Sequence, residues 1–477
     1  MPTSTVMLIA IGFYILFVCA VGVWSSRKAK DEVGFLVAGR SLGPILGGAT
    51  LMANQVSAGT TVGIVGFHYF SGISFAWTWP LTWVGWMVAA FFVAPNLRTF
   101  AGVTLSDYFA TRFQSESIRV LASILILMGY TFMLSAQYQA GGLIFGMVTA
   151  MPYTRAVLLV ASISFLYTVL GGMYSNAYIG LLKAGILITA YCCAIPFLLH
   201  QTGGLSTLAS SLYAIDPKLT GGWFSVRQLI ALSLAVGLGT ATAPYEITAF
   251  YSLASQRATR LAIGYSFLFQ AFVAIGVLLC GLSARNLMPY LLSPDLAAPT
   301  LGLEVLPEWI GVLLLLAVVV TLTRTAGALL LTSASSFSHD VYLHFLRPRA
   351  SEREKLVVHR VMIGLLALAP ISIAFAKLDL VNFVILFAVK FLASAFFAPV
   401  VIGLNWRRAT RAGAITSMVL GPAAVMLWAR FQHPTLFGLE AAEAGLLANT
   451  LSFIVVSLAD LRMRPRAPQH PPDQQHL

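Results

Sequence analysis

The stretch Gly47-Gly-Ala-Thr-Leu-Met-Ala-Asn-Gln-Val-Ser-Ala-Gly-Thr-Thr61 places small and polar residues in the middle of an otherwise apolar run. The stretch Gly237-Leu-Gly-Thr-Ala-Thr-Ala-Pro-Tyr-Glu246 has the same character. In a bilayer, a helix is interrupted only where it is buried in protein or lines a cavity. The two stretches therefore predict broken helices that meet at a binding site near the middle of the membrane. The alternative is that the small residues only allow close helix packing.

The overall composition is that of a membrane protein. Of the 477 residues, 58% are hydrophobic and 10% are charged, against about 25% charged in soluble domains. The net charge of +12 comes from positive residues scattered at the ends of apolar runs, which indicates topology signals rather than a nucleic-acid-binding face. The four cysteines lie in apolar runs without metal-ligand spacing. We therefore expect an all-α polytopic membrane protein with no metal site, no cofactor and no enzymatic activity.

Apolar runs long enough to cross a bilayer divide the chain into about 13 predicted spans. They cover residues 5–25, 45–70, 76–97, 118–148, 154–172, 178–199, 226–252, 260–283, 307–335, 357–376, 380–403, 411–430 and 440–459. The broken helices are the second and seventh spans, which predicts inverted five-helix repeats over about 45–200 and 226–403. We expect one transmembrane transporter domain over 1–460 and a disordered cytoplasmic tail over 461–477.

Basic residues gather in alternate loops between the predicted spans, and this bias sets the orientation. The richer set of loops contains Arg27, Lys28, Lys30, Arg98, Arg112, Arg257, Arg260, Arg347, Arg349, Arg353, Lys355, Arg407, Arg408, Arg411, Arg462, Arg464 and Arg466. The poorer set contains Arg155, Lys218, Arg227 and Arg285. We expect an integral protein of the plasma (inner) membrane, with the amino terminus outside and the carboxyl terminus in the cytoplasm.

Five segments, in order along the chain, resemble the sodium:solute symporter family, which includes proline, pantothenate and sodium–glucose transporters. They are Phe35-Leu-Val-Ala-Gly-Arg-Ser-Leu-Gly-Pro44, Thr104-Leu-Ser-Asp-Tyr-Phe-Ala-Thr-Arg-Phe113, Tyr167-Thr-Val-Leu-Gly-Gly-Met173, Ser335-Ser-Phe-Ser-His-Asp-Val-Tyr342 and Trp406-Arg-Arg-Ala-Thr410. The resemblance covers about residues 5–460. It implies the leucine-transporter fold, alternating access and, in ordinary members, sodium-driven uptake of solute.

The resemblance also implies where a sodium ion would bind. Family members hold it with backbone carbonyls of the first broken helix and with a carbonyl and hydroxyls of the eighth core helix. Aligned through the downstream Asp-Val-Tyr, the carbonyls map to Ala53, Val56 and Thr321, and the hydroxyl pair maps to Arg324 and Thr325. One hydroxyl ligand is therefore replaced by a permanent cation.

Arg324 lies deep in the predicted span 307–335, where an ionised side chain is costly and marks a functional site by default. At about 4 Å and an effective dielectric of about 20, it would repel a sodium ion by about 4 kcal/mol. We hypothesise that its guanidinium takes the place of sodium by donating to the carbonyls of Ala53 and Val56. The alternatives are a structural arginine paired with an acid, or an alignment displaced by one helical turn.

Other positions on the expected ion route also depart from the family. An acidic residue near the first break aligns with Gln55, and the Trp-Thr-Asp common after Gly-Gly-Met aligns with Tyr178-Ile-Gly180. A glutamine that follows aligns with Lys183, whose ammonium we expect to reach the cytoplasmic surface. These departures predict a transporter that is independent of sodium or coupled to protons.

Further polar residues inside the predicted spans are candidates for the solute site. Lys390 either binds an anionic solute or changes its protonation during transport; alternatively, it pairs with Glu246 or with a backbone carbonyl. Glu246 either couples transport to protons or pairs with a cation; alternatively, it lies near the surface. Gln137 and Tyr138 match a patch that faces solute in the family. The predicted solute-binding residues are Gln55, Ser57, Gln137, Tyr138, Thr240, Thr242, Glu246 and Lys390.

These observations predict a secondary or facilitative transporter of a small organic solute, and two buried cations favour an organic anion. Its expected partners are the solute, the lipid bilayer and a coupling ion, which is a proton, or sodium if Arg324 does not fill the ion site. The first alternative is an ordinary sodium symporter with a relocated ion site. The second is a transporter-like membrane sensor.

Overall fold

The computed structural model describes residues 3–97, 100, 102–376, 381–430 and 440–463. Over these residues the fold is helical, and its one β pairing is an isolated bridge between Leu42 and Leu253. The longer helices are α1 (Thr3–Ser26), α3 (Pro44–Gln55), α5 (Thr78–Val88), α8 (Glu116–Thr149), α9 (Tyr153–Gln201), α10 (Gly204–Ile215), α11 (Val226–Thr242), α13 (Gln256–Leu287), α15 (Glu308–Phe337), α16 (Glu352–Leu366), α18 (Val381–Phe397), α20 (Arg411–Arg430) and α21 (Ala441–Met463). The shorter ones are α2 (Glu32–Val37), α4 (Val65–Ser71), α6 (Ala94–Leu97), α7 (Leu105–Phe113), α12 (Pro244–Ser252), α14 (Ala297–Thr300), α17 (Leu368–Ala376), α19 (Gly403–Asn405), and the 3-10 or π turns η1 (Ala38–Arg40), η2 (Gly59–Ile64), η3 (Gly72–Trp77), η4 (Ala89–Val93), η6 (Pro217–Thr220), η7 (Pro294–Leu296), η8 (Leu301–Val305), η9 (Ser338–Leu346) and η10 (Ala398–Ile402).

The all-α polytopic architecture is confirmed. In the described part of the chain, 10 helices are long and apolar enough to cross a membrane, or up to 11 if the bent pair α11–α12 is one span. The number 13 stays a prediction, and the predicted tail falls almost entirely on residues 464–477, outside the described residues. Helix α9 has 49 residues, which at about 1.5 Å per residue is more than twice the hydrocarbon thickness of about 30 Å. It therefore holds both predicted spans 154–172 and 178–199.

Gly172 makes the sharp turn inside α9. Its φ of 54° and ψ of −136° are not helical, and this backbone conformation is open to glycine but strained for other residues. A Cβ at this position would also lie 2.4 Å from the carbonyl oxygen of Phe35. The glycine thus lets the chain kink while α2 packs directly against the kink.

Both predicted breaks are present. Helix α3 ends at Gln55, Val56 is extended with φ −74° and ψ 108°, and the helix resumes with η2 and α4. Helix α11 ends at Thr242, Ala243 is extended with φ −61° and ψ 129°, and α12 begins at Pro244 with a bend of 41°. Proline suits this first helical position, because its missing N–H would have no helical partner there.

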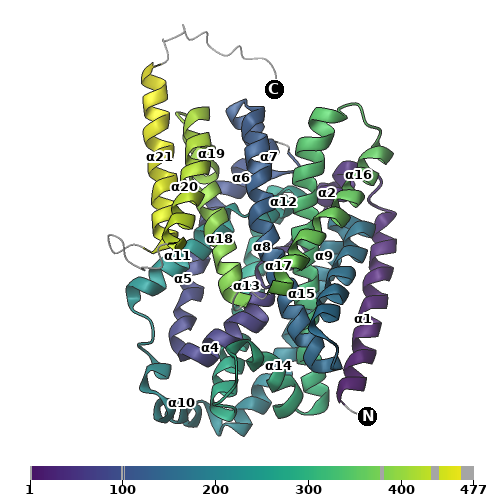
Figure 1. The fold of residues 1–477 in the computed structure, drawn as a ribbon, viewed down its shortest axis with the longest axis vertical. Helices are drawn as coiled ribbons and strands as arrows, with labels where there is room; N and C mark the ends of the chain where they lie inside the picture. The colour runs from purple at the N-terminus through teal and green to yellow at the C-terminus, as the bar shows by residue number, and fades with distance from the viewer. Residues whose placement is uncertain (1–2, 98–99, 101, 377–380, 431–439, 464–477) are drawn as a thin grey trace.

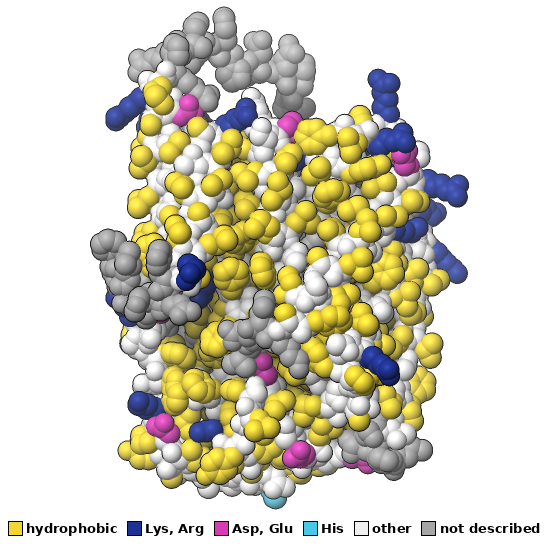
Figure 2. Space-filling view, viewed as in Figure 1, with side chains coloured by type: hydrophobic (Ala, Val, Ile, Leu, Met, Phe, Trp, Pro, Cys, Tyr) yellow, Lys and Arg dark blue, Asp and Glu magenta, His cyan; other side chains and the backbone are white. Residues whose placement is uncertain are grey.

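Helix α15 lies within the bundle, where it packs against α1, α8 and α9 (Figure 1). Its most apolar stretch is the most enclosed of the candidate spans. Helix α1 begins near one end of the molecule, and α21 ends at the other (Figure 1). Figure 2 shows a largely hydrophobic side surface, with many of the Lys and Arg side chains toward the end where α21 finishes. That surface suits contact with lipid.

The two broken helices are joined at one end by the bridge between Leu42 and Leu253. The Leu42 N–H donates to the Ser252 carbonyl at 3.0 Å, and the Ala254 N–H donates to the Leu42 carbonyl at 3.0 Å. Because these segments directly precede α3 and directly follow α12, the two half-helices are held to each other by backbone hydrogen bonds.

Candidate solute and cation site

A lysine ammonium lies at the break of the first helix. Lys183, from the second half of α9, is completely buried. Its Nζ donates to the carbonyl oxygen of Ala53 at 2.8 Å, to that of Val56, and to Oγ1 of Thr325 at 3.3 Å. The break frees these two carbonyls, because the chain beyond Val56 does not continue the helix that would bond them. The Lys183 side-chain nitrogen, held by these oxygens, therefore occupies the break.

Three predicted ion-site positions, Ala53, Val56 and Thr325, meet at this ammonium. The Thr325 hydroxyl also lies 3.0 Å from the Thr321 carbonyl and 3.3 Å from those of Ala53 and Val56. The Thr321 hydroxyl itself has no partner within the described residues. The expectation that Lys183 reaches the surface is wrong, because its side chain points inward to the freed carbonyls.

Arg324 does not bind the carbonyls of Ala53 and Val56, so that prediction is wrong. Its guanidinium donates to the Asn176 carbonyl at 3.2 Å, to the Thr50 carbonyl at 3.4 Å, and to Oδ1 of Asn54. Thr50 lies one turn before Ala53 on α3, so the guanidinium lies about one turn from the predicted position. Lys183 already holds that position.

Gly180 makes room for Arg324. A Cβ on this glycine would lie 3.4 Å from Nε of Arg324 and 3.3 Å from Cβ of Ala53. Any larger side chain would compete with the guanidinium for this space. The glycine at position 180 and the arginine at position 324 are thus linked by packing.

The side-chain amides of Asn54 and Gln55, on the first broken helix, both donate to Glu246 on the second. The Asn54 Nδ2 donates to Oε2 of Glu246 at 3.3 Å, and the Gln55 Nε2 donates to Oε1 of Glu246 at 2.7 Å. The Thr240 hydroxyl donates to Oε1 of Gln55 at 3.0 Å. Because Asn54 also accepts from Arg324, a continuous chain of hydrogen bonds runs from Arg324 to Thr240. The alternative that Glu246 lies near the surface is wrong, since it is fully buried.

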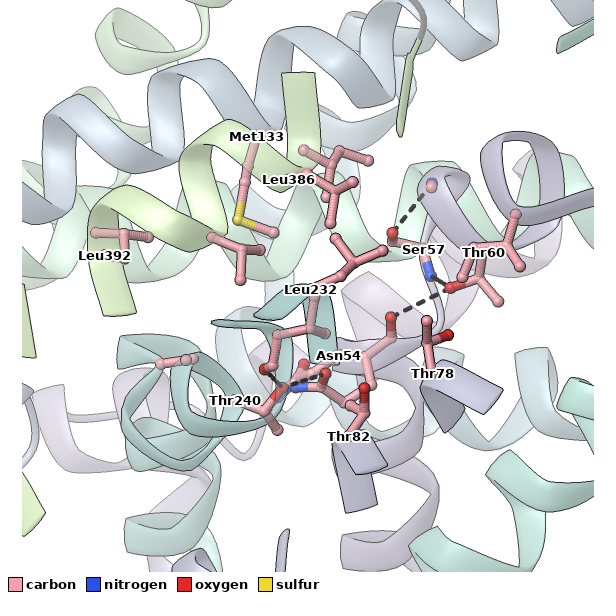
Figure 3. Close-up of a pocket in the computed structure, with 18 of the residues that line it drawn as sticks. Asn54, Ser57, Thr60, Thr78, Thr82, Met133, Leu232, Thr240, Leu386 and Leu392 are labelled. Carbon is pink, nitrogen blue, oxygen red and sulfur yellow. Dashed lines mark hydrogen bonds between the residues drawn. The ribbon is translucent and has the colours of Figure 1, made fainter. Parts of the chain in front are cut away.

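A cavity of about 110 Å³ lies beside this network, between the two broken helices and α5, α8, α13 and α18. Figure 3 shows Leu392, Met133 and Leu386 along one side and Ser57, Thr60, Thr78 and Thr82 along the other. Of the predicted solute-binding residues, Gln55, Ser57 and Thr240 line it. The polar lining residues that sequence reasoning missed are Asn54, Thr60, Thr78, Trp79, Thr82, Tyr130, Tyr245 and Gln270.

The other five predicted solute-binding residues do not line the cavity. Gln137 is buried and accepts the Ala58 N–H at 3.0 Å, so it supports the first break. Tyr138 is buried, and its hydroxyl has no partner within the described residues. Thr242 bonds to carbonyls of its own helix. Glu246 contacts the lining residues Gln55 and Asn54 and does not itself line the cavity. Lys390 has an electrostatic interaction with Glu440.

A second charged cluster lies at the end of the molecule opposite the start of α1. His339 contacts Glu32 at 2.7 Å through Nδ1 and Asp107 at 3.2 Å through Nε2, and Arg119 contacts Asp107 at 2.6 Å. Arg119 also lies 3.4 Å from Asp340. Asp107, His339 and Asp340 are close enough to share a metal ion, but both histidine nitrogens and the arginine already contact carboxylates. The cluster is therefore an ion-pair network joining α2, α7, α8 and η9.

This network changes the acidity of two carboxyls outside the spans. Burial alone would raise the pKa of Glu32, but hydrogen bonds and positive charge from His339 and His359 lower that pKa well below its usual range. Burial would likewise raise the pKa of Asp107, and contacts with His339, the Val103 N–H and Arg119 lower it well below its usual range.

Comparison with solved structures identifies the fold as that of a LeuT-like transporter. A Na+-coupled sialic acid symporter in a substrate-bound outward-open state superimposes with a TM-score of 0.83 at 16% identity, covering 95% of this chain and 98% of that one. MHP1, a nucleobase-cation-symport-1 family transporter in a closed conformation with bromovinylhydantoin bound, gives 0.57 at 13% identity, covering 89% and 93%.

The chain belongs to the sodium:solute symporter family, whose sequence model matches residues 35–421. The Escherichia coli (strain K12) sodium/proline symporter is 28% identical over 483 residues, covering 96% of this chain and 94% of the relative. The Bacillus subtilis (strain 168) high-affinity proline transporter PutP is 26% identical over 432 residues, covering 86% and 89%. The protein is thus an integral membrane protein of a solute transporter family.

Proposed function

We propose that this protein transports a small organic solute by alternating access without sodium, and that the Lys183 ammonium permanently fills the position of the family's sodium ion. The observation that carries the proposal is the set of contacts from Nζ to the Ala53 and Val56 carbonyls and the Thr325 hydroxyl. These are the ligands that the family resemblance assigns to sodium. The tethered ammonium would hold the first broken helix to α15, as a bound ion does in a symporter.

Electrostatics supports this proposal over ordinary sodium coupling, which the family and its relatives would otherwise imply. A sodium ion at these oxygens would overlap the ammonium, and displacing the ammonium would leave a buried charge unpaired. A unit charge at about 4 Å still opposes sodium by about 4 kcal/mol at an effective dielectric of about 20. The Arg324 guanidinium, which contacts Thr50 and Asn54 on the same helix, adds a further positive charge close to this position.

Any active uptake would then need another coupling ion, and we propose a proton carried by Glu246. Glu246 is the carboxylate of the described network that contacts Gln55 at the cavity. Uptake into proteoliposomes driven by an inward proton gradient should fall in Glu246→Gln. Equal uptake by Glu246→Gln would exclude that carboxylate as the carrier.

The orientation and location remain part of this proposal. Basic side chains are more frequent toward the end where α21 finishes (Figure 2), which supports a cytoplasmic position for that end under the positive-inside rule. The amino terminus would then face outward, with the protein in the plasma (inner) membrane.

Equilibrium binding of radioactive sodium to the purified protein tests the sodium-independent reading. The native protein should show no saturable binding. Lys183→Ala combined with Arg324→Ser should gain it, because the freed carbonyls are left without either cation. Lys218→Ala, which removes an exposed lysine elsewhere, should behave like the native protein. Saturable binding by the native protein would contradict the proposal and restore the sodium symporter.

A further inference from the structure

The polar and charged groups around the cavity differ from those that an ionised solute requires. No Asp, Glu, Lys, Arg or His side chain of the described residues lines it. Lys183 and Arg324 point to the backbone of α3 instead, and Glu246 is bonded to Asn54 and Gln55. A charge moved out of water is strongly destabilised unless it is paired. Side chains of this cavity therefore provide no counter-ion for a solute.

Backbone N–H groups at the first break are also occupied. Such half-helix beginnings are where transporters of this architecture bind anionic groups. Here the Ser57 N–H donates to the Thr60 hydroxyl at 3.2 Å, the Ala58 N–H to Gln137 at 3.0 Å, and the Gly59 N–H to the Ser57 hydroxyl at 3.1 Å. The next two N–H groups donate to the Ser57 carbonyl. A solute carboxylate would find no free amide donor there.

The backbone N–H groups at the second break also have acceptors already. The Tyr245 N–H donates to the Tyr130 hydroxyl at 2.8 Å, and the N–H groups of Glu246 and Ile247 donate to the Ala243 carbonyl at 2.9 and 3.1 Å. Pro244 has no N–H. Tyr130 and Tyr245 both line the cavity, so this hydrogen bond occupies the donor that a carboxylate would otherwise use.

What remains is a neutral surface with two faces. Leu232, Leu386, Val389 and Leu392, from α11 and α18, give the cavity an apolar lining. Figure 3 shows Leu386 and Leu392 across from the hydroxyl-bearing Thr60 of η2 and Thr78 of α5. The indole N–H of Trp79, on the α5 side, has no partner within the described residues. The cavity volume suits a molecule of on the order of ten non-hydrogen atoms.

We infer that the solute is an uncharged amphipathic small molecule, with a hydroxyl, carbonyl or amide group at one end and a short aliphatic body at the other. This inference rests on the proposed function, because it takes the cavity to be the transport site. It replaces the organic anion expected from the two buried cations, since neither cation faces the cavity. It also excludes a zwitterion such as the proline named for the relatives.

Probes that share an aliphatic body and differ in the charge of the head group test the inference. One set is isovaleramide, isovalerate and isopentylammonium, a second is isocaproamide, isocaproate and isohexylammonium, and L-proline completes the panel. Thermal unfolding of the purified full-length protein at neutral pH is followed against probe concentration. The amides should stabilise the protein at concentrations about tenfold lower than their charged counterparts or L-proline. Equal or stronger stabilisation by any charged probe, or none by either amide, would overturn the inference.

A variant tests whether the occupied N–H groups cause this preference. Tyr130→Phe removes the acceptor of the Tyr245 N–H, so the carboxylates should bind several-fold more tightly relative to the amides. The control is Tyr138→Phe, which removes a buried hydroxyl from the same helix away from the cavity. An unchanged amide-to-carboxylate ratio in Tyr130→Phe would contradict the role of the N–H groups.

Running the panel in sodium chloride and in choline chloride separates this inference from the proposed function. An effect of sodium on amide binding would contradict sodium independence and leave the solute class intact. A preference for charged probes in both salts would overturn the solute class and leave the Lys183 proposal intact.

Discussion

The Lys183 and Arg324 side chains are both buried at the last turns of α3, and each contacts oxygens there. Removing a charge from water costs several kcal/mol, and hydrogen bonds must offset that cost. Lys183 uses the carbonyls that the break frees, while Arg324 uses the carbonyl of Thr50 and the side chain of Asn54. Asn54 also donates to Glu246. It therefore links a buried cation and a buried carboxylate that have no direct contact among the described ion pairs.

Replacement of Asn54 by alanine should destabilise the protein by about 2–3 kcal/mol, because it leaves one bond of Arg324 and one of Glu246 unmade in the interior. The measurement is the free energy or midpoint of unfolding in detergent. Thr242→Ala is the control, since within the described structure that hydroxyl donates to carbonyls of its own helix. A loss in Asn54→Ala no larger than in this control would contradict the bridging role.

The sequence predicted which oxygens lie together at the first break better than it predicted which side chain contacts them. Ala53, Val56 and Thr325 converge as expected, because the breaks and the alignment specify backbone positions. The predicted position of the Arg324 guanidinium was wrong by about one helical turn, and the prediction that Lys183 reaches the surface was wrong. Which way a long flexible side chain extends depends on free space such as that beside Gly180, and a single sequence does not encode this space locally.

At the scale of elements, the shape of the site depends on where helices stop and reverse. Glycine, proline and small polar clusters mark these points in the sequence, so both breaks were predictable. The helix faces that line the cavity were not, because α5, α8 and α18 are apolar on most sides and their rotation follows from packing with neighbours. Gln137 illustrates this difference. The sequence predicted that its polar side chain contacts the solute, but the side chain accepts the Ala58 N–H and does not line the cavity.

Gly172→Ala tests the kink in α9. The new Cβ would lie 2.4 Å from the Phe35 carbonyl oxygen at a φ of 54°, so we expect a loss of about 2–4 kcal/mol or failure to fold. Gly185→Ala on the same helix is the matched control, since nothing lies within 4 Å of its Cβ. It should be neutral or stabilise by up to about 1 kcal/mol. Similar stability of the two variants would show that the turn at Gly172 is not under this constraint.

At the scale of the whole molecule, the ion-pair network of Glu32, Asp107, Arg119 and His339 joins segments that are distant in sequence. The pKa values of Glu32 and Asp107 are lowered in the folded protein. A carboxyl with a lowered folded pKa adds stability above its unfolded pKa, near 4, and this stability is lost as the pH falls toward the folded pKa. Native stability should therefore drop steeply below about pH 4.

Asp107→Asn should be less stable than the native protein at neutral pH and should lose less stability between about pH 5 and 3. The measurement is the unfolding midpoint as a function of pH. Glu304→Gln, which alters an exposed carboxyl, should follow the native curve. Parallel curves for Asp107→Asn and the native protein would contradict the linkage.

If the Lys183 ammonium takes the place of sodium as proposed, the fact that this charge belongs to the polypeptide also determines the electrical behaviour of transport. A bound sodium ion crosses with the solute and carries current, whereas a charge on the polypeptide returns with the chain at the end of every cycle. If the solute is also uncharged and no proton accompanies it, one complete cycle moves no net charge across the bilayer. The rate of net flux would then follow the solute gradient, and the membrane potential would provide no driving force for accumulation.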